Sequence, residues 1–213
     1  YDDPGSGAQE RDFAQRRMLE EIDILSRTSP LRTTPPQPSD EVRTVMSVFD
    51  QTLFQAVPRL YRTVESAIAD GEPGRCRPSV PGFLRFGSWV GGDRDGNPFV
   101  TAEVTRQTMS IQAECILKAL ATGADRVART LTMSEDASPP SPELASALAR
   151  DSVTAPEIFQ LIRKSSPGEP HRQKLLFVAT RLTATREGQI DLAYRKPAEL
   201  VADLSLIQTS LEQ

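Results

Sequence analysis

Apolar residues recur at helical spacing from the beginning of the chain. Met18, Ile22 and Leu25 follow one another at intervals of four and three residues. This spacing places side chains on one face of an α-helix. The pattern predicts a first helix over residues 8–26. The next residues, 29–38, are rich in proline, so we expect a connector that no helix crosses.

A second amphipathic stretch covers residues 39–68. Ser39 is placed to be its N-cap, with the acidic residues Asp40 and Glu41 in the first turn, where negative charge favours the helix dipole. Because proline lacks an N–H, we expect Pro58 to kink or break this helix. Its predicted apolar side consists of Val42, Val45, Phe49, Leu53, Leu60, Val64 and Ile68.

Later segments predict five more helices, over residues 101–132, 143–150, 156–164, 170–187 and from 197 onward. Thr101 is the expected N-cap of the longest of them. Pro156 and Pro170 stand where a first-turn proline is tolerated.

Residues 83–90 are the one strand candidate, short, aromatic and partly alternating. A lone strand leaves backbone N–H and C=O groups without partners. We therefore expect a second, hidden strand, or a sheet whose other strands lie outside this chain. The predicted fold is mainly α: a helical domain with one or two short strands, part of a larger helical α/β-barrel enzyme. Residues 1–7 are expected to be a disordered lead-in, and residues 8–213 a single helical fragment.

Composition and charge narrow the possible partners. Among 213 residues the formal net charge is −4, with no basic stripe of the kind that recruits nucleic acid. Apolar runs are shorter than a membrane span requires, and the first residues do not resemble a signal peptide. Any anionic ligand must therefore be held by a local cluster of cations. Cys76 and Cys115 lack metal-type spacing, and we expect both to be free thiols.

The segment from Phe86 to Pro98 reads FGSWVGGDRDGNP and contains the only tryptophan, Trp89. Its glycines permit close approach of the backbone to a ligand. The planar guanidinium of Arg94 matches the geometry of a carboxylate or phosphate group. The neighbouring acidic residues could orient this guanidinium or bind a metal. Phosphate-binding, dinucleotide-binding and calcium-loop motifs do not fit this spacing. On residue types alone, a solvated turn is the commoner explanation.

This segment, with Val100 and Thr101 after it, resembles a signature of phosphoenolpyruvate carboxylases: FGSW, one apolar residue, GGDRDGNP, one variable residue, then VT. Weaker similarity extends over residues 25–43, 50–58 and 171–182, so the resemblance covers most of the chain, with residues 134–170 the least secure. It implies part of an enzyme that carboxylates phosphoenolpyruvate with bicarbonate to oxaloacetate and phosphate, using Mg²⁺ or Mn²⁺. It also implies a cytoplasmic, homo-oligomeric protein built around a barrel, without nucleic-acid or membrane partners.

The resemblance also assigns roles to individual residues. Trp89, Gly91, Gly92 and Arg94 are the expected substrate-binding residues, and Trp89 and Arg94 contribute to the pocket. Arg94 would either neutralise an anion or pair with a neighbouring acid to fix the turn. The three remaining polar residues, Asp93, Asp95 and Asn97, would build the loop rather than bind metal.

The chain lacks the family's catalytic-histidine motif, catalytic-lysine signature and metal-binding acids. We therefore expect no complete catalytic set, no metal ligands here, and no activity from this chain alone. The single histidine, His171, is expected to be a solvated or capping residue. Arg75, Arg77 and Arg85 would form an anion site with Arg94 or be ordinary surface residues. The alternative function is a free-standing helical module derived from that family, which binds anions or serves regulation or interaction.

Overall fold

The computed structural model describes residues 8–28, 37–68 and 80–213. Internal contacts divide the chain into two compact units, Tyr1–Pro36 and Gln37–Gln213. The predicted lead-in, residues 1–7, lies outside the described residues. The assignment of residues 8–213 to a single domain stays a prediction, and the two units are described separately.

The described part of the first unit is one helix, α1 (Ala8–Arg27), which confirms the first predicted helix. Ion pairs between residues four apart, Arg16 with Asp12 and Arg27 with Asp23, run along its surface. Its apolar side chains are exposed and include Phe13, Met18, Leu19, Ile22 and Leu25.

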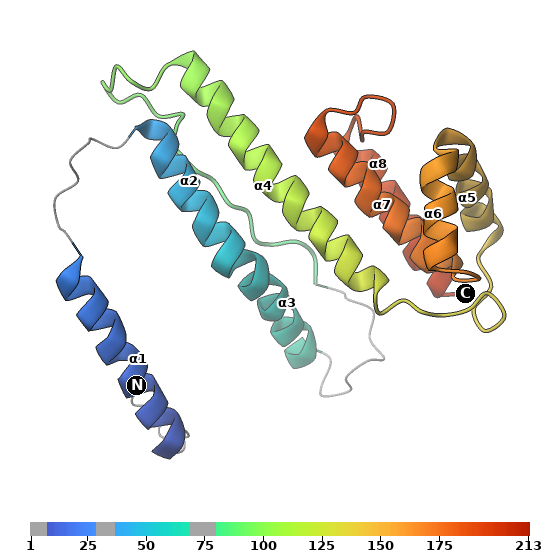
Figure 1. Ribbon diagram of the computed structural model, residues 1–213, viewed down its shortest axis with the longest axis horizontal. Coiled ribbons are helices and arrows are strands. Elements are labelled where there is room, and N and C mark those ends of the chain that lie inside the picture. Colours follow the sequence, from blue (N-terminus) through green and yellow to red (C-terminus); the bar gives the residue numbers. More distant parts are fainter. Residues whose placement is uncertain (1–7, 29–36, 69–79) are drawn as a thin grey trace. The chain divides into compact units, whose positions relative to one another are not determined.

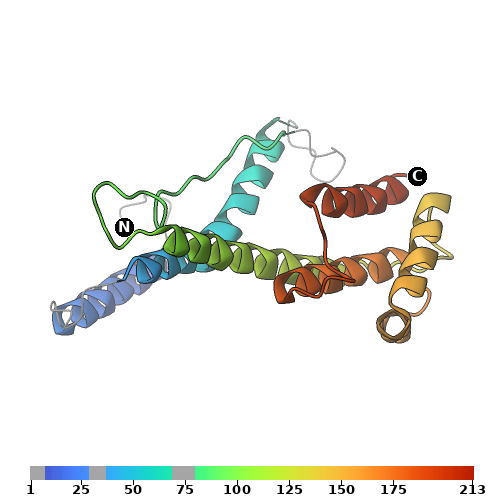
Figure 2. The same ribbon diagram turned by 90° about the horizontal axis from the view of Figure 1, so that it is seen from above.

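The second unit begins with α2 (Pro38–Val48), a π-helical turn η1 (Phe49–Leu53) and α3 (Phe54–Ile68). The N-cap is Gln37, not Ser39. The Asp40 carboxylate accepts a hydrogen bond from the Gln37 N–H at 3.0 Å, and Pro38 takes the first helical position, where its missing N–H costs nothing. Pro58 lies inside α3. Helix α3 leaves the direction of α2 (Figure 2), as expected where a π-turn and a proline interrupt regular hydrogen bonding.

The long helix α4 (Ala102–Ala128) carries the predicted cap, since Thr101 Oγ1 accepts a hydrogen bond from the Val104 N–H at 3.3 Å. It ends before residue 132, because the N–H groups of Thr130 and Leu131 turn back to the Val127 carbonyl. Helix α4 packs beside α2 and beside α7 (Figure 1).

Four shorter helices complete the second unit: α5 (Pro142–Thr154), α6 (Pro156–Ser165), α7 (Pro170–Glu187) and α8 (Pro197–Leu211). Each has a proline in its first turn, as predicted for α6 and α7, and α5 extends four residues beyond its predicted end. The core lies among these helices and the end of α4. Its most buried large residues include Phe159, Phe177, Leu144, Leu182 and Val178.

The predicted strand over residues 83–90 is wrong. Those residues form an extended segment that leads back to the start of α4, and the described ranges contain no strand at all. Among the residues described, no neighbouring strand satisfies the backbone. Instead, the Tyr61 hydroxyl accepts hydrogen bonds from the N–H groups of Phe83 at 2.9 Å and Leu84 at 3.1 Å. The mainly α class is confirmed.

Candidate functional site

The segment between α3 and α4 is fixed near residues 83–86 by aromatic contacts. The ring of Phe83 lies 4.7 Å from that of Tyr61, and the ring of Phe86 lies 5.2 Å from that of Phe49. These contacts, with the two hydrogen bonds to Tyr61, hold the segment against η1 and α3. Packing on these helices therefore sets where the glycine-rich loop begins.

The first half of the loop is a tight turn centred on Gly91. The carbonyl of Trp89 accepts hydrogen bonds from the N–H groups of Gly92 at 2.9 Å and Asp93 at 2.8 Å. Gly91 is buried with φ +74°, and a Cβ at this position would lie 2.0 Å from Thr108 Oγ1 on α4. Only glycine fits here. The close approach that Gly91 permits is to α4, whereas Gly92 is exposed.

The second half of the loop is stabilised by its own backbone and by Asn97. The side-chain oxygen of Asn97 accepts a hydrogen bond from the Phe99 N–H at 3.0 Å, and the Asn97 N–H donates to the carbonyl of Arg94. Asp95 and Gly96 both have positive φ. The carboxylates of Asp93 and Asp95 form no hydrogen bond or ion pair within the ranges that the structure describes.

Trp89 and Arg94 are exposed on this framework. Trp89 is 78% exposed, and Arg94 is exposed as well. One of the two predicted roles of Arg94 was to fix the turn by pairing with a neighbouring acid. Among the described residues, its guanidinium forms no ion pair. It is free to meet an external anion. Arg85 is exposed as well, while Arg75 and Arg77 lie outside the described residues.

The loop is not part of a cluster of metal-ligating side chains in the described part of the chain. Among the residues described, no group of three or more histidine, cysteine, aspartate or glutamate side chains could hold a metal ion. Asp93 and Asp95 are the only acidic side chains of the loop, and the Asn97 oxygen accepts the Phe99 N–H. That the metal ligands of the enzyme lie outside this loop stays a prediction.

A cavity of about 630 Å³ with a mostly apolar lining lies at the start of the loop, and we name it the apolar groove. Helix α4 forms one wall with Met109, Gln112, Ala113, Cys115 and Ile116, and residues 86–88 close it together with Met46, Phe49, Leu53, Phe54, Val57 and Pro58. Burial raises the pKa of the Cys115 thiol, so this residue stays protonated near neutral pH. Cys115 is a free cysteine, as expected, and Cys76 lies outside the described residues.

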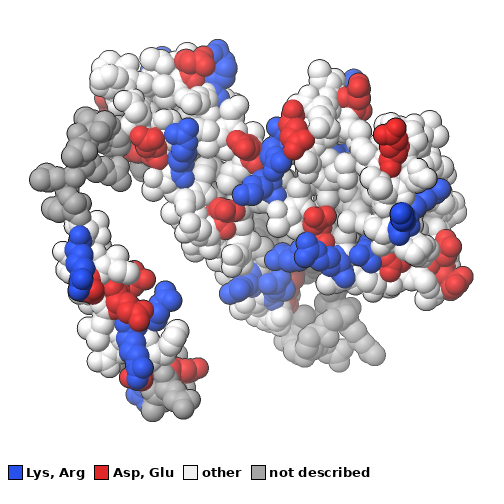
Figure 3. All heavy atoms as spheres, in the orientation of Figure 1, with Lys and Arg blue, Asp and Glu red and all other residues white. Residues whose placement is uncertain are grey.

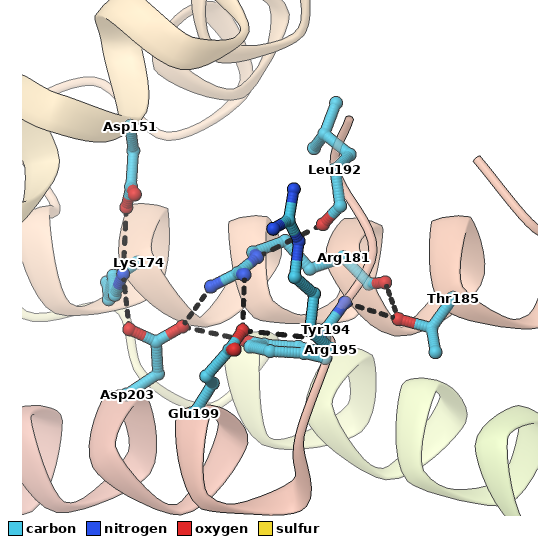
Figure 4. Close-up of polar contacts among 9 residues, drawn as sticks. All are labelled: Asp151, Lys174, Arg181, Thr185, Leu192, Tyr194, Arg195, Glu199 and Asp203. Carbon is cyan, nitrogen blue, oxygen red and sulfur yellow. Dashed lines mark hydrogen bonds and ion pairs between the residues drawn. The ribbon is translucent and has the colours of Figure 1, made fainter. Parts of the chain in front are cut away.

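A buried network of charged side chains joins α5, α7 and α8 (Figure 4). Lys174 Nζ lies 2.9 Å from Asp151 and 2.8 Å from Asp203. Arg181 contacts Asp203 at 3.1 Å and lies 3.8 Å above the ring of Tyr194. The Tyr194 hydroxyl donates a hydrogen bond to Asp203 at 2.7 Å. Burial raises the pKa of the Tyr194 hydroxyl. The network is internally satisfied, so we interpret it as structural.

The prediction that His171 is solvated or a cap is wrong. The residue is fully buried, and its Nε2 lies 2.9 Å from the Ser210 hydroxyl. Ser210 Oγ also accepts the N–H of Ser141 at 2.9 Å, so the first turn of α7 packs between α5 and α8. Burial lowers the pKa of the imidazole. Enclosed in this way, His171 cannot reach a substrate.

Sequence reasoning missed several of these groups. Tyr61 and Thr108 position the loop, yet each lies on a helix where nothing nearby in the sequence marks it. Lys174 looks like an ordinary helical lysine until α5 and α8 are folded against it. Among these groups, only Asn97 was recognisable from its near neighbours, because it lies within a glycine-rich turn.

None of the described helices is long and apolar enough to cross a membrane. A family model described as phosphoenolpyruvate carboxylase matches residues 1–213. The chain is 33% identical over 208 residues to the phosphoenolpyruvate carboxylase of Roseiflexus castenholzii, covering 92% of this chain and 22% of that protein. It is 36% identical over 213 residues to the phosphoenolpyruvate carboxylase of a Synechocystis species, covering 92% of this chain and 20% of that protein. The chain thus spans about a fifth of the length of the curated relatives it matches.

Proposed function

Because the chain belongs to the phosphoenolpyruvate carboxylase family, we propose that it forms part of an enzyme that carboxylates phosphoenolpyruvate. In that reaction, bicarbonate attacks the phosphate to give carboxyphosphate and an enolate. Carboxyphosphate then releases carbon dioxide and phosphate, and the enolate captures the carbon dioxide to form oxaloacetate. The enzyme is a lyase that requires Mg²⁺ or Mn²⁺, and we place it in the cytoplasm as a homo-oligomer.

One observation supports this proposal most strongly: two exposed side chains, those of Trp89 and Arg94, stand on a loop that is held in place by packing and hydrogen bonds. Trp89 and Arg94 stand on a turn that is packed on α4 through Gly91 and held by backbone hydrogen bonds. The packed turn sets the position of the Arg94 backbone, and a guanidinium placed there would stabilise developing negative charge. Arg94 would bind the anionic substrate, and the ring of Trp89 would form a wall that keeps carbon dioxide from water.

The rest of the enzyme would supply the groups that the described residues do not offer. The general base cannot be His171, because that side chain is fully buried. We expect the ligands of the divalent cation to lie outside this loop as well. We therefore propose that this chain is inactive by itself and that Trp89 and Arg94 complete a pocket whose base and metal ligands come from the remainder of the protein.

The proposal is tested by Arg94→Ala in the intact enzyme that contains this segment. With saturating bicarbonate and Mg²⁺, and malate dehydrogenase to report oxaloacetate, we expect kcat/KM for phosphoenolpyruvate to fall by about 100-fold, the effect of losing one contact to developing charge.

Arg106→Ala is the matched control, since Arg106 is exposed nearby on α4 and paired with Glu103. Its removal should leave kcat/KM within about twofold, as for an ordinary surface ion pair. Equal effects of the two substitutions would contradict the role of Arg94.

A further inference from the structure

A second cavity lies next to the apolar groove, farther along α4. Helix α3 diverges from α4 after the π-turn (Figure 2). Phe54 and Pro58 line both cavities and so form the partition between them. The second cavity has a volume of about 620 Å³ and lies between α3 and the C-terminal half of α4. We name it the basic cleft.

The cleft is lined by four cations, Arg59 and Arg62 from α3 and Lys118 and Arg126 from α4. Its one acidic lining residue is Asp50. In a chain of formal net charge −4, this is a local excess of positive charge. Figure 3 shows blue side chains gathered over the C-terminal half of α4 and the neighbouring part of α3.

Several exposed arginines of the chain are paired along a helix, whereas these four cations have no acidic partner among the described residues. Arg16, Arg27, Arg43 and Arg106 each form an ion pair with an acid three or four residues away on the same helix. Within the described ranges, none of the cleft cations forms an ion pair or a side-chain hydrogen bond. Four like charges held around one cavity repel one another, and a bound anion would relieve that repulsion.

We propose that the basic cleft binds a small multivalent anion that carries phosphate or carboxylate groups. Guanidinium groups match the geometry of both, and a lysine adds a point charge. The volume falls in the range of small-molecule sites, and Phe54, Pro58 and Val127 offer apolar surface to a carbon skeleton. Because the four cations are exposed, solvent and salt screen the attraction, so a ligand with several charges is required. This site is distinct from the loop that carries Trp89 and Arg94.

The test is titration calorimetry on the purified chain at low ionic strength, with pyrophosphate and citrate as separate probes. We expect saturable binding of at least one probe and a loss of affinity as salt is raised from about 0.02 M to about 0.2 M. The double variant Lys118→Gln/Arg126→Gln should weaken binding by at least about tenfold, since it removes two of four charges. The probe that binds more tightly identifies phosphate or carboxylate as the preferred group.

Arg150→Gln is the matched control, because Arg150 is exposed on α5, has no ion pair within the described residues and does not line the cleft. It should leave the Kd unchanged, and Arg94→Ala should leave it unchanged as well. If the double variant lost its helical circular dichroism, Arg62→Gln alone would serve. The proposal is overturned if neither probe binds, if the cleft variants keep the wild-type Kd, or if Arg94→Ala weakens binding as much as they do.

Discussion

Gly91 and Gly96 lie in the same loop, both with positive φ, but their surroundings differ. A Cβ at Gly91 meets Thr108 at 2.0 Å, whereas a Cβ at Gly96 meets nothing within 4 Å. Gly91→Ala must therefore add a steric clash to the backbone strain. We expect it to lower the free energy of unfolding by about 3 kcal/mol.

Gly96→Ala adds only the backbone strain of positive φ, and it should lower the free energy of unfolding by about 1 kcal/mol. Urea denaturation of the two variants measures the difference directly. Equal losses would mean that the loop does not pack on α4 as the structure shows.

The burial of His171 leads to a second prediction, on how the free energy of unfolding depends on pH. Burial lowers the pKa of its imidazole, so between the folded value and the unfolded value near ~6.5 the unfolded chain binds more protons. The stability that His171 contributes is present above pH ~6.5 and is lost as the pH falls below it. We expect the free energy of unfolding to decline from pH ~7 toward ~5.

The control is His171→Gln, which removes the only histidine. Whatever its effect on stability at neutral pH, the variant should show a shallower pH slope, and chemical denaturation across this range measures it. An unchanged slope would mean that the imidazole is not held neutral by burial.

At the residue scale, the sequence predicts the roles that depend on near neighbours. Thr101 is recognisable as a cap, and Pro156 and Pro170 as first-turn residues, because these roles follow from helix ends alone. The burial of His171 is not recognisable, because it depends on Ser210, which is 39 residues away.

At the scale of elements, the network around Lys174 and Asp203 locks α7 onto α5 and α8. Asp203 contacts Lys174, Arg181 and Tyr194, and its side chain is only 15% exposed. Asp203→Asn would leave buried cations without full compensation. We expect a loss of about 3 kcal/mol in the free energy of unfolding.

Glu199→Gln is the comparison within the same network, since Glu199 contacts Arg181 but is 39% exposed. Solvent screens this pair, and the loss should stay below about 1 kcal/mol. Guanidinium denaturation distinguishes the two variants, and a larger loss at Glu199 would contradict the structural role of the buried carboxylate.

The helices themselves are largely predictable, since apolar spacing and proline positions mark them. The extended segment is not, because aromatic residues in a short alternating run favour a strand only if a second strand lies beside it. Tyr61 replaces that strand as hydrogen-bond acceptor. No local pattern identifies a tyrosine 22 residues earlier in the chain for this role.

At the scale of the whole molecule, the second unit exposes apolar side chains around the apolar groove, among them Phe86 and the 65% exposed Met109. Surfaces of this kind associate in water. We expect the isolated chain to self-associate as its concentration rises, with the sedimentation coefficient as the readout. The variant Phe86→Ser/Met109→Ser should remain monomeric at higher concentration.

Val153→Ser provides the control, because Val153 is 82% exposed on α5 and lines neither the apolar groove nor the basic cleft. It should associate like the unmodified chain. If Val153→Ser suppressed association equally, the groove would not be the surface responsible.

We propose that this chain supplies Trp89 and Arg94 to a phosphoenolpyruvate carboxylase whose other catalytic groups lie elsewhere. The most direct measurement is oxaloacetate formation by the purified chain with phosphoenolpyruvate, bicarbonate and Mg²⁺, coupled to malate dehydrogenase. We expect no activity from the chain alone, and activity when the remainder of the enzyme is added as a separate polypeptide. Oxaloacetate formed by the chain alone, and abolished by Arg94→Ala, would contradict this proposal.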